Sequence, residues 1–205
     1  SMKIRMKRKL AVVLLICISC HIGWAAQDFV WKSGQNMKVV CDTTEAPVVK
    51  VALDLLKRDC RSVLSGEISH SENTGNIYVG TWGESSVLQA LADTRQLDVA
   101  QLNEHKEAFL LNVLPDGRLV VAGSDKRGTI YGIYELSKQI GISPWYWWLD
   151  VPPVRHQAVY IKEGVYTDGE PAVKYRGIFI NDEWPCMGGW TTEKFGGFNS
   201  KMYAV

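Results

Sequence analysis

Between residues 29 and 167 the sequence alternates short apolar runs with stretches of helical periodicity. The run Lys38–Cys41 is typical of a short buried strand, and Thr44 is placed to cap a helix that follows it. From there to Gly66, apolar residues recur at steps of three and four, the spacing of one helix face: Val48, Ala52, Leu55, Leu56, Cys60, Val63 and Leu64. Strands and helices in this order restrict the region to an α/β fold.

Further along, two apolar runs flank the turn Pro115-Asp116-Gly117, which predicts a β-hairpin from residues 107–113 and 118–122. Before the hairpin, the sequence predicts a second strand and a shorter helix at residues 76–81 and 84–91. The expected sheet is therefore small and mixed, because the hairpin adds an antiparallel pair to the strand–helix pattern.

A strand–loop–helix segment follows the hairpin, with the loop at Gly123–Gly128 and a helix to Gln139. The two glycines have the spacing of a phosphate-binding loop, but Thr129 and Ile130 stand where such a loop has Lys and Ser or Thr. Without a Lys at that position, the loop lacks the charge that meets a β/γ-phosphate. We interpret the loop as a capped helix start, with Gly128 and Gly132 allowing helix and sheet to approach closely.

Residues 157–161 predict one more strand, and the Gly- and Pro-rich residues 163–172 are typical of a linker. We therefore expect residues 26–167 to form one N-terminal α/β domain, in which a small mixed sheet is covered by helices.

The first 25 residues have the pattern of an export signal. A basic stretch to Lys9 precedes the apolar run Leu10–Ile18 and small residues near Ala25, where cleavage is expected. The apolar run is too short to span a bilayer. The chain is expected to be secreted or periplasmic, with lipid attachment at Cys20 as the alternative.

Charge and cysteine usage exclude several kinds of partner. The net charge is +1, but without the first 25 residues 18 basic and 22 acidic residues remain, which argues against a nucleic-acid partner. Beyond the signal only Cys41, Cys60 and Cys186 are left, and neither they nor the isolated histidines have metal-ligand spacing. No metal site is expected.

Four consecutive aromatic residues, Trp145-Tyr146-Trp147-Trp148, stand in a Pro-bounded loop. They cannot all point into one core from such a loop. One interpretation is a contact between domains, since aromatic residues are enriched at interface centres. The alternative is a platform on which the apolar faces of sugar rings stack.

Beyond the linker, the apolar run from Tyr175 ends in the polar residues Asn181, Asp182 and Glu183. This pattern is typical of a buried parallel strand whose carboxyl end faces a site, as in (β/α)8 barrels. Only 32 residues remain from Lys174 to Val205, whereas a barrel needs about 200 or more. Residues 168–205 are thus expected to hold a linker and the first strand and loop of a truncated catalytic barrel.

Three motifs together resemble glycoside hydrolase family 115, a family of exported α-glucuronidases acting on xylan: Gly123–Tyr134, Ser143–Trp148 and Arg176–Glu183. The resemblance extends from about Val39 to Tyr203. It implies a hexosaminidase-type N-terminal α/β domain followed by the start of a (β/α)8 barrel. Residues 188–199 also resemble the family's first βα loop, before a helix that begins near Lys201.

The resemblance implies a reaction that removes 4-O-methylglucuronic acid, linked α-1,2 to xylan, with inversion. Inversion needs two carboxyl groups ~6.5–9.5 Å apart and, in this family, no metal or redox cofactor. Most of the carboxylates of such a barrel would lie beyond Val205, so this chain is expected to be inactive alone and no catalytic residue is assigned within it.

As groups that bind the substrate, glucuronoxylan or its oligosaccharides, we expect Asp182 first, then Glu183, Asn181 and Trp147. For Asp182 the alternative is a structural role, capping the loop or pairing with Arg176. For the whole chain, the alternatives are a non-catalytic carbohydrate-binding module that uses Trp145, Trp147 and Trp148, or a structural accessory domain.

Overall fold

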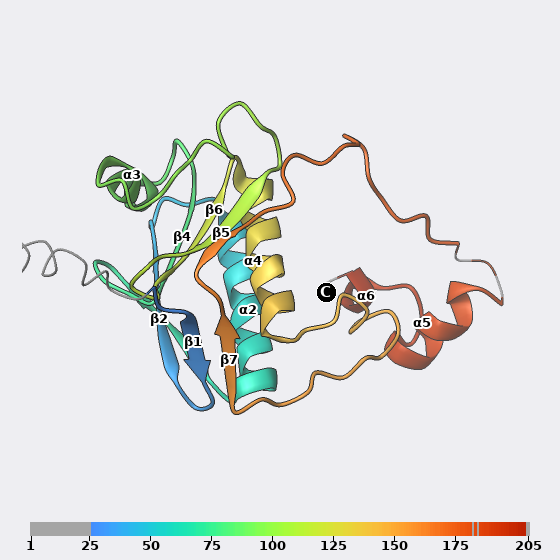
Figure 1. The fold of residues 1–205 in the computed structure, drawn as a ribbon. Coiled ribbons are helices and arrows are strands. Elements are labelled where there is room, and N and C mark those ends of the chain that lie inside the picture. The colour runs from blue at the N-terminus through green and yellow to red at the C-terminus, as the bar shows by residue number, and fades with distance from the viewer. Residues whose placement is uncertain (1–25, 182, 184, 204–205) are drawn as a thin grey trace, which may run out of the picture. The chain divides into compact units, whose positions relative to one another are not determined.

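A computed structural model describes residues 26–181, 183 and 185–203, which form two compact units divided between Pro171 and Ala172 (Figure 1). The expected export signal, residues 1–25, lies outside the described residues. Across the described residues no helix is both long enough and apolar enough to cross a membrane.

The first unit is built on a six-stranded sheet with the order β3-β2-β4-β6-β5-β8. The strands are β2 (Asn36–Cys41), β3 (Glu67–Ser71), β4 (Ile77–Thr81), β5 (Phe109–Val113), β6 (Leu119–Gly123) and β8 (Gly164–Tyr166). The first four in spatial order are parallel, and β5 runs antiparallel to both of its neighbours. The sheet is therefore mixed, and its antiparallel β5–β6 pair is the predicted hairpin.

A separate two-stranded sheet pairs the start of the unit with its end. Strand β1 (Phe29–Lys32) runs antiparallel to β7 (Ala158–Ile161), with Trp31 opposite Val159. Both inward-facing residues of β1, Phe29 and Trp31, are fully buried. The pair thus closes one side of the main core.

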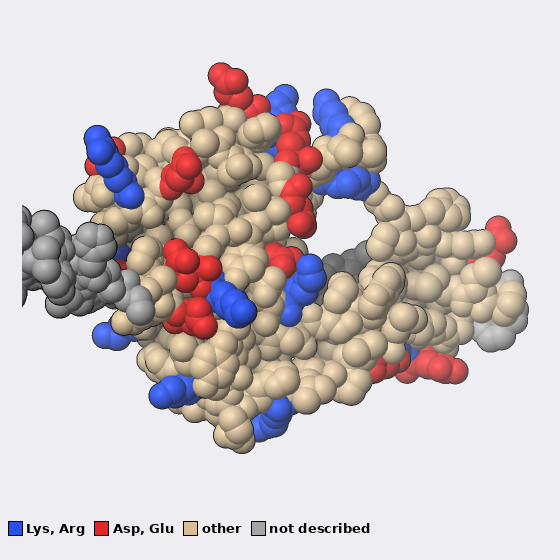
Figure 2. Space-filling view, viewed as in Figure 1, with Lys and Arg blue, Asp and Glu red and all other residues tan. Residues whose placement is uncertain are grey.

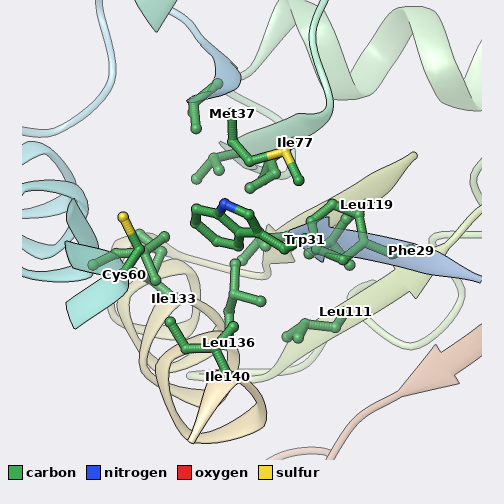
Figure 3. Close-up of a cluster of buried hydrophobic side chains, with 14 of the residues drawn as sticks. Phe29, Trp31, Met37, Cys60, Ile77, Leu111, Leu119, Ile133, Leu136 and Ile140 are labelled. Atoms are coloured by element: carbon green, nitrogen blue, oxygen red, sulfur yellow. The ribbon is translucent and has the colours of Figure 1, made fainter. Parts of the chain in front are cut away.

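Helices cover both faces of the six-stranded sheet. Helices α2 (Pro47–Leu64) and α4 (Lys126–Ile140) lie side by side on one face, and α3 (Ser86–Asp93) lies on the other (Figure 1). The larger core lies under α2 and α4, and Trp31 is at its centre (Figure 3). Ile133 and Leu136 of α4 contribute to one side of this cluster. Burial of such large apolar side chains is the main favourable contribution to folding.

Helix α2 begins later than its capping signal predicts. Its N-cap is Ala46 rather than Thr44, and no side chain caps it. The buried face also starts one residue later, because Val49 is buried while Val48 is 47% exposed. Pro47 at the first helical position, where a missing N–H costs nothing, explains the later start.

Close packing at the start of α4 confirms the interpretation of the glycine loop. Asp125 caps the helix by accepting a hydrogen bond from the Gly128 N–H, 2.8 Å between N and Oδ1. A Cβ added to Gly128 would lie 2.1 Å from the carbonyl oxygen of Ala108, the residue before β5. Only glycine allows this helix to approach the sheet so closely.

The structure contains three strands that the sequence does not predict: β1, β3 and β8. Strand β8 occupies part of residues 163–172, which the sequence predicts to be a linker. Just after it, the Thr167 hydroxyl donates to the Phe109 carbonyl, and Glu170 accepts from the Lys106 N–H at 3.2 Å. The end of the first unit is therefore bound to strand β5 and to the loop before β5.

The second unit contains α5 (Met187–Phe195) and α6 (Ser200–Tyr203). The predicted strand after Tyr175 is wrong: the described residues there form no strand, and Ile178 and Phe179 are 72% and 91% exposed. A strand requires backbone partners, and no described strand follows β8. The predicted loop at 188–199 is largely helix α5, while the helix expected near Lys201 is confirmed as α6.

Candidate functional site

The carboxyl ends of the parallel strands gather polar residues in the first unit. Strand order reverses between β2 and β4, since β2 leads through α2 to β3 on one side and β4 lies on the other. Such a switch point is where open α/β sheets bind ligands. Asp42 follows β2 directly, Thr81 ends β4, and Asp125 follows β6 by two residues.

Glu45 is the buried carboxylate of this edge, only 5% exposed. Its two oxygens accept from the backbone N–H of Thr81 at 2.9 Å and from its hydroxyl at 2.8 Å. The Thr81 hydroxyl also lies 2.8 Å from that of Thr129, which bonds to the Gly80 carbonyl. This network joins the residues before α2 to β4 and α4, and it explains why a carboxylate can be buried here.

Asp42 binds the start of α3 in the same way. Its carboxylate accepts from the hydroxyls of Ser85 and Ser86 at 2.9 and 2.8 Å, and from the Ser86 N–H at 2.8 Å. Partial burial opposes ionisation, but the hydrogen bonds from Ser86 and Ser85 and from the backbone of Ser86 and Val87 together lower the pKa of Asp42 below its ordinary value. The negative charge of Asp42 is therefore stabilised by hydrogen bonds from the protein.

Asp125 is also fully engaged, because it accepts from the Gly128 N–H and, at 2.8 Å, from the Glu107 N–H. Together with Asp42 and Glu45 it acts as an acceptor within the fold. The hydrogen bonds of these three carboxylates hold the loops at this edge of the first unit in place.

The aromatic segment 145–148 forms a turn, with the Leu149 N–H bonded to the Trp145 carbonyl at 2.9 Å. Trp145 is the most exposed of its aromatic residues, at 56%. Trp147, the residue expected to touch sugar, is half-buried and makes further contacts within the structure. The four rings thus do not form one open platform.

The expected substrate-binding residues at the end of the apolar run are only partly described. Asn181 forms a local turn, since its side-chain oxygen accepts from the Glu183 N–H at 3.0 Å. Its carbonyl accepts from the Met187 N–H at 3.2 Å, just as α5 begins. Glu183 is exposed, and Asp182 lies outside the described residues. Asn181 therefore sets the direction of the chain into α5.

Within the described part of the chain, no cluster of His, Cys, Asp or Glu has the geometry to hold a metal ion. Cys41 and Cys60 are buried free thiols, and desolvation, with neighbouring carboxylates, raises their pKa to about 12 and about 11. Such thiols are unreactive at neutral pH. On the face in Figure 2, acidic and basic side chains are interspersed over the first unit.

Comparisons with known proteins assign the family. Residues 168–205 match the model for glycosyl hydrolase family 115, and residues 30–136 match that for the N-terminus of glycosyl hydrolase family 67. A solved structure, described as a family 115 4-O-methyl-α-glucuronidase, BtGH115A, with specificity for decorated arabinogalactans, is 43% identical over 85% of this chain, with a TM-score of 0.74. The chain belongs to glycosyl hydrolase family 115.

The family 115 chain spans 22% of the length of BtGH115A. A β-hexosaminidase from Streptomyces plicatus matches 74% of the chain and 25% of its own length, at 12% identity and a TM-score of 0.49. No curated protein sequence matches. The 43% identity to BtGH115A confirms the family expected from the sequence motifs, and the observed sheet confirms the mixed α/β fold.

Proposed function

We propose that this family 115 chain supplies the N-terminal α/β domain and the start of the catalytic (β/α)8 barrel of an exported α-glucuronidase. The observation that carries the proposal is the 43% identity to a 4-O-methyl-α-glucuronidase over 85% of the chain. Residues 1–25 would be the signal peptide, 26–167 the domain and 168–205 the linker and first barrel segment.

The proposed reaction is inverting hydrolysis, in which one carboxylic acid protonates the leaving oxygen and one carboxylate activates water. Asp42, Glu45 and Asp125 are committed to hydrogen bonds within the first unit and offer no such pair. We therefore propose that this chain alone does not turn over substrate. Asp182 is proposed to bind hydroxyls of the glucuronic acid or to orient water, with Glu183, Asn181 and Trp147 as further substrate contacts.

Two polysaccharides are candidate substrates. Glucuronoxylan is the one that the sequence resemblance implies. Decorated arabinogalactan is the second, because the 43% identical relative is described as specific for it. Both would present a terminal 4-O-methylglucuronic acid, so the sugar that is released is the same.

The test is a hybrid enzyme in which this chain replaces the matching segment of BtGH115A. We expect the hybrid to release 4-O-methylglucuronic acid from at least one of the two polysaccharides, measured by chromatography, and the 205-residue chain to release none. A hybrid that folds but is inactive on both would refute the proposed activity.

In the same hybrid, Asp182→Asn keeps the shape of the side chain and removes its charge. We expect kcat/KM to fall by about 10²-fold or more, the scale of a lost catalytic or orienting carboxylate, with little change in Tm. The matched control is Glu193→Gln, an exposed carboxyl in α5. If activity survives and Tm falls, Asp182 is structural.

A further inference from the structure

A cavity of about 230 Å³ lies between α2 and the edge strand β3. Its apolar floor comes from Val39 of β2, Leu53 of α2 and Ile68 of β3. It exists because β3 is the outermost strand of the sheet, and among the described residues no further helix covers the sheet beyond α2. At about 30 Å³ per water molecule in the liquid, the space suits a ligand the size of one sugar ring.

Charged and polar side chains surround this apolar floor. Lys50, Asp54 and Lys57 stand on the same face of α2, at the spacing i, i+4 and i+7, and His70 faces them from β3. The Lys50 ammonium donates to the Thr43 carbonyl at 2.8 Å and keeps two further N–H donors.

The other three charged or polar side chains around the cavity have no partner within hydrogen-bond distance among the described residues. In the described structure the side chains of Lys57, Asp54 and His70 make no hydrogen bond or ion pair. Glu67, the nearest acidic neighbour on β3, is instead paired with Arg61 through two bonds of 2.8 Å. Donors of both lysines and an unused carboxylate therefore remain available around one small hollow.

We propose that this cavity of the first unit binds a single hexuronic acid residue of the polysaccharide. The lysine ammonium groups would bind the sugar carboxylate, Asp54 and His70 would accept or donate hydrogen bonds with ring hydroxyls, and the floor would contact the apolar C–H face. A ligand that carries a carboxylate, hydroxyls and an apolar face matches this mixture, including the acidic Asp54 that a simple anion site would lack.

The choice of a uronic acid rests on the proposed function, but the test does not need catalysis. The ¹⁵N-labelled 205-residue chain is titrated with 4-O-methylglucuronic acid, and amide shifts are followed by NMR. We expect saturable shifts with a millimolar Kd at the amides of Leu53, Ile68 and His70. The neutral 4-O-methylglucose, which carries a hydroxymethyl group in place of the carboxylate, should bind at least about fivefold more weakly.

Lys57→Gln removes the charge and keeps most of the side-chain length, and it should weaken binding of 4-O-methylglucuronic acid by at least about fivefold. The matched control is Lys126→Gln at the exposed start of α4, which should bind as the unchanged chain does. Absence of saturable shifts at the cavity, or unchanged binding by Lys57→Gln, overturns the inference. An active hybrid without cavity binding refutes this inference alone, whereas cavity binding with an inactive hybrid refutes only the proposed activity.

Discussion

Asp42 and Glu45 lie three residues apart, and their carboxylates bind different parts of the first unit. Glu45 is buried and accepts both hydrogen bonds that Thr81 can donate. Asp42 is partly exposed and holds the first turn of α3 through Ser85 and Ser86. Because hydrogen bonds to charged groups contribute about 1.5–3 kcal/mol each before burial costs, these two side chains fix the loops after β2 and β4.

The lowered pKa of Asp42 predicts a pH dependence of stability. Its pKa in the folded chain lies below the ordinary value of 3.8, so the unfolded chain binds a proton more readily as the pH falls. The contribution of Asp42 is thus fully present above about pH 4 and is lost as the pH falls through its folded pKa. In urea unfolding, we expect Asp42→Asn to be less stable than the unchanged chain at pH 7, with the difference narrowing below about pH 4.

The control for Asp42→Asn is the loss of an exposed carboxylate that makes no such hydrogen bonds within the described structure. Glu72→Gln, at an exposed position, should change the free energy of unfolding at pH 7 by no more than about 0.5 kcal/mol. A difference between Asp42→Asn and the unchanged chain that stays constant from pH 7 to pH 3 would contradict the role assigned to Asp42.

The sequence could have indicated part of this polar edge, but not all of it. Asp42 follows a predicted strand directly, which is a position where functional or capping carboxylates are common. Glu45 gives no such signal, since Glu is rarely buried and its partner Thr81 is 36 residues away. The proposed sugar-binding cavity is likewise hidden in the sequence, because His70 reaches it from a strand that the pattern does not predict.

At the scale of elements, the strongly periodic segments are those that sequence reasoning located correctly: α2, the hairpin β5–β6 and α4. The strands it missed are short or polar. Strand β3 reads Glu-Ile-Ser-His-Ser because it is an edge strand with one side open to water. The strand predicted after Tyr175 shows the opposite error, since an apolar run forms a strand only where neighbouring strands supply backbone partners.

The contact between α4 and the sheet predicts a graded response to two alanine substitutions. In Gly128→Ala the new Cβ would meet the Ala108 carbonyl at 2.1 Å, and backbone cannot move aside cheaply. We expect a loss of about 2 kcal/mol or more in the free energy of unfolding, measured by urea denaturation. Gly132→Ala should cost less, because its nearest neighbour, at 2.8 Å, is the end of the Val121 side chain. Equal stability of Gly128→Ala and the unchanged chain would contradict this packing.

At the scale of the whole molecule, the two units predict where a protease acts first. Tyr175 and Phe179 are 83% and 91% exposed and lie outside any helix or strand, whereas Tyr166 belongs to β8. We expect brief chymotrypsin treatment to cleave after Tyr175 or Phe179 and to leave a stable fragment of the first unit, identified by mass spectrometry. Cleavage after Tyr166 at the same rate would show that β8 does not bind the end of the first unit.

The pairing of β1 with β7 has a consequence for when the first unit can complete its folding during synthesis. Strand β1 carries Trp31, the centre of the main core, yet its partner strand follows roughly 130 residues later. During synthesis Trp31 emerges early, whereas Val159, which lies opposite it in β7, emerges only when residues 158–161 are made. The β1–β7 pair, which joins the first strand of the unit to its last strand but one, can therefore form only after most of the first unit has been made.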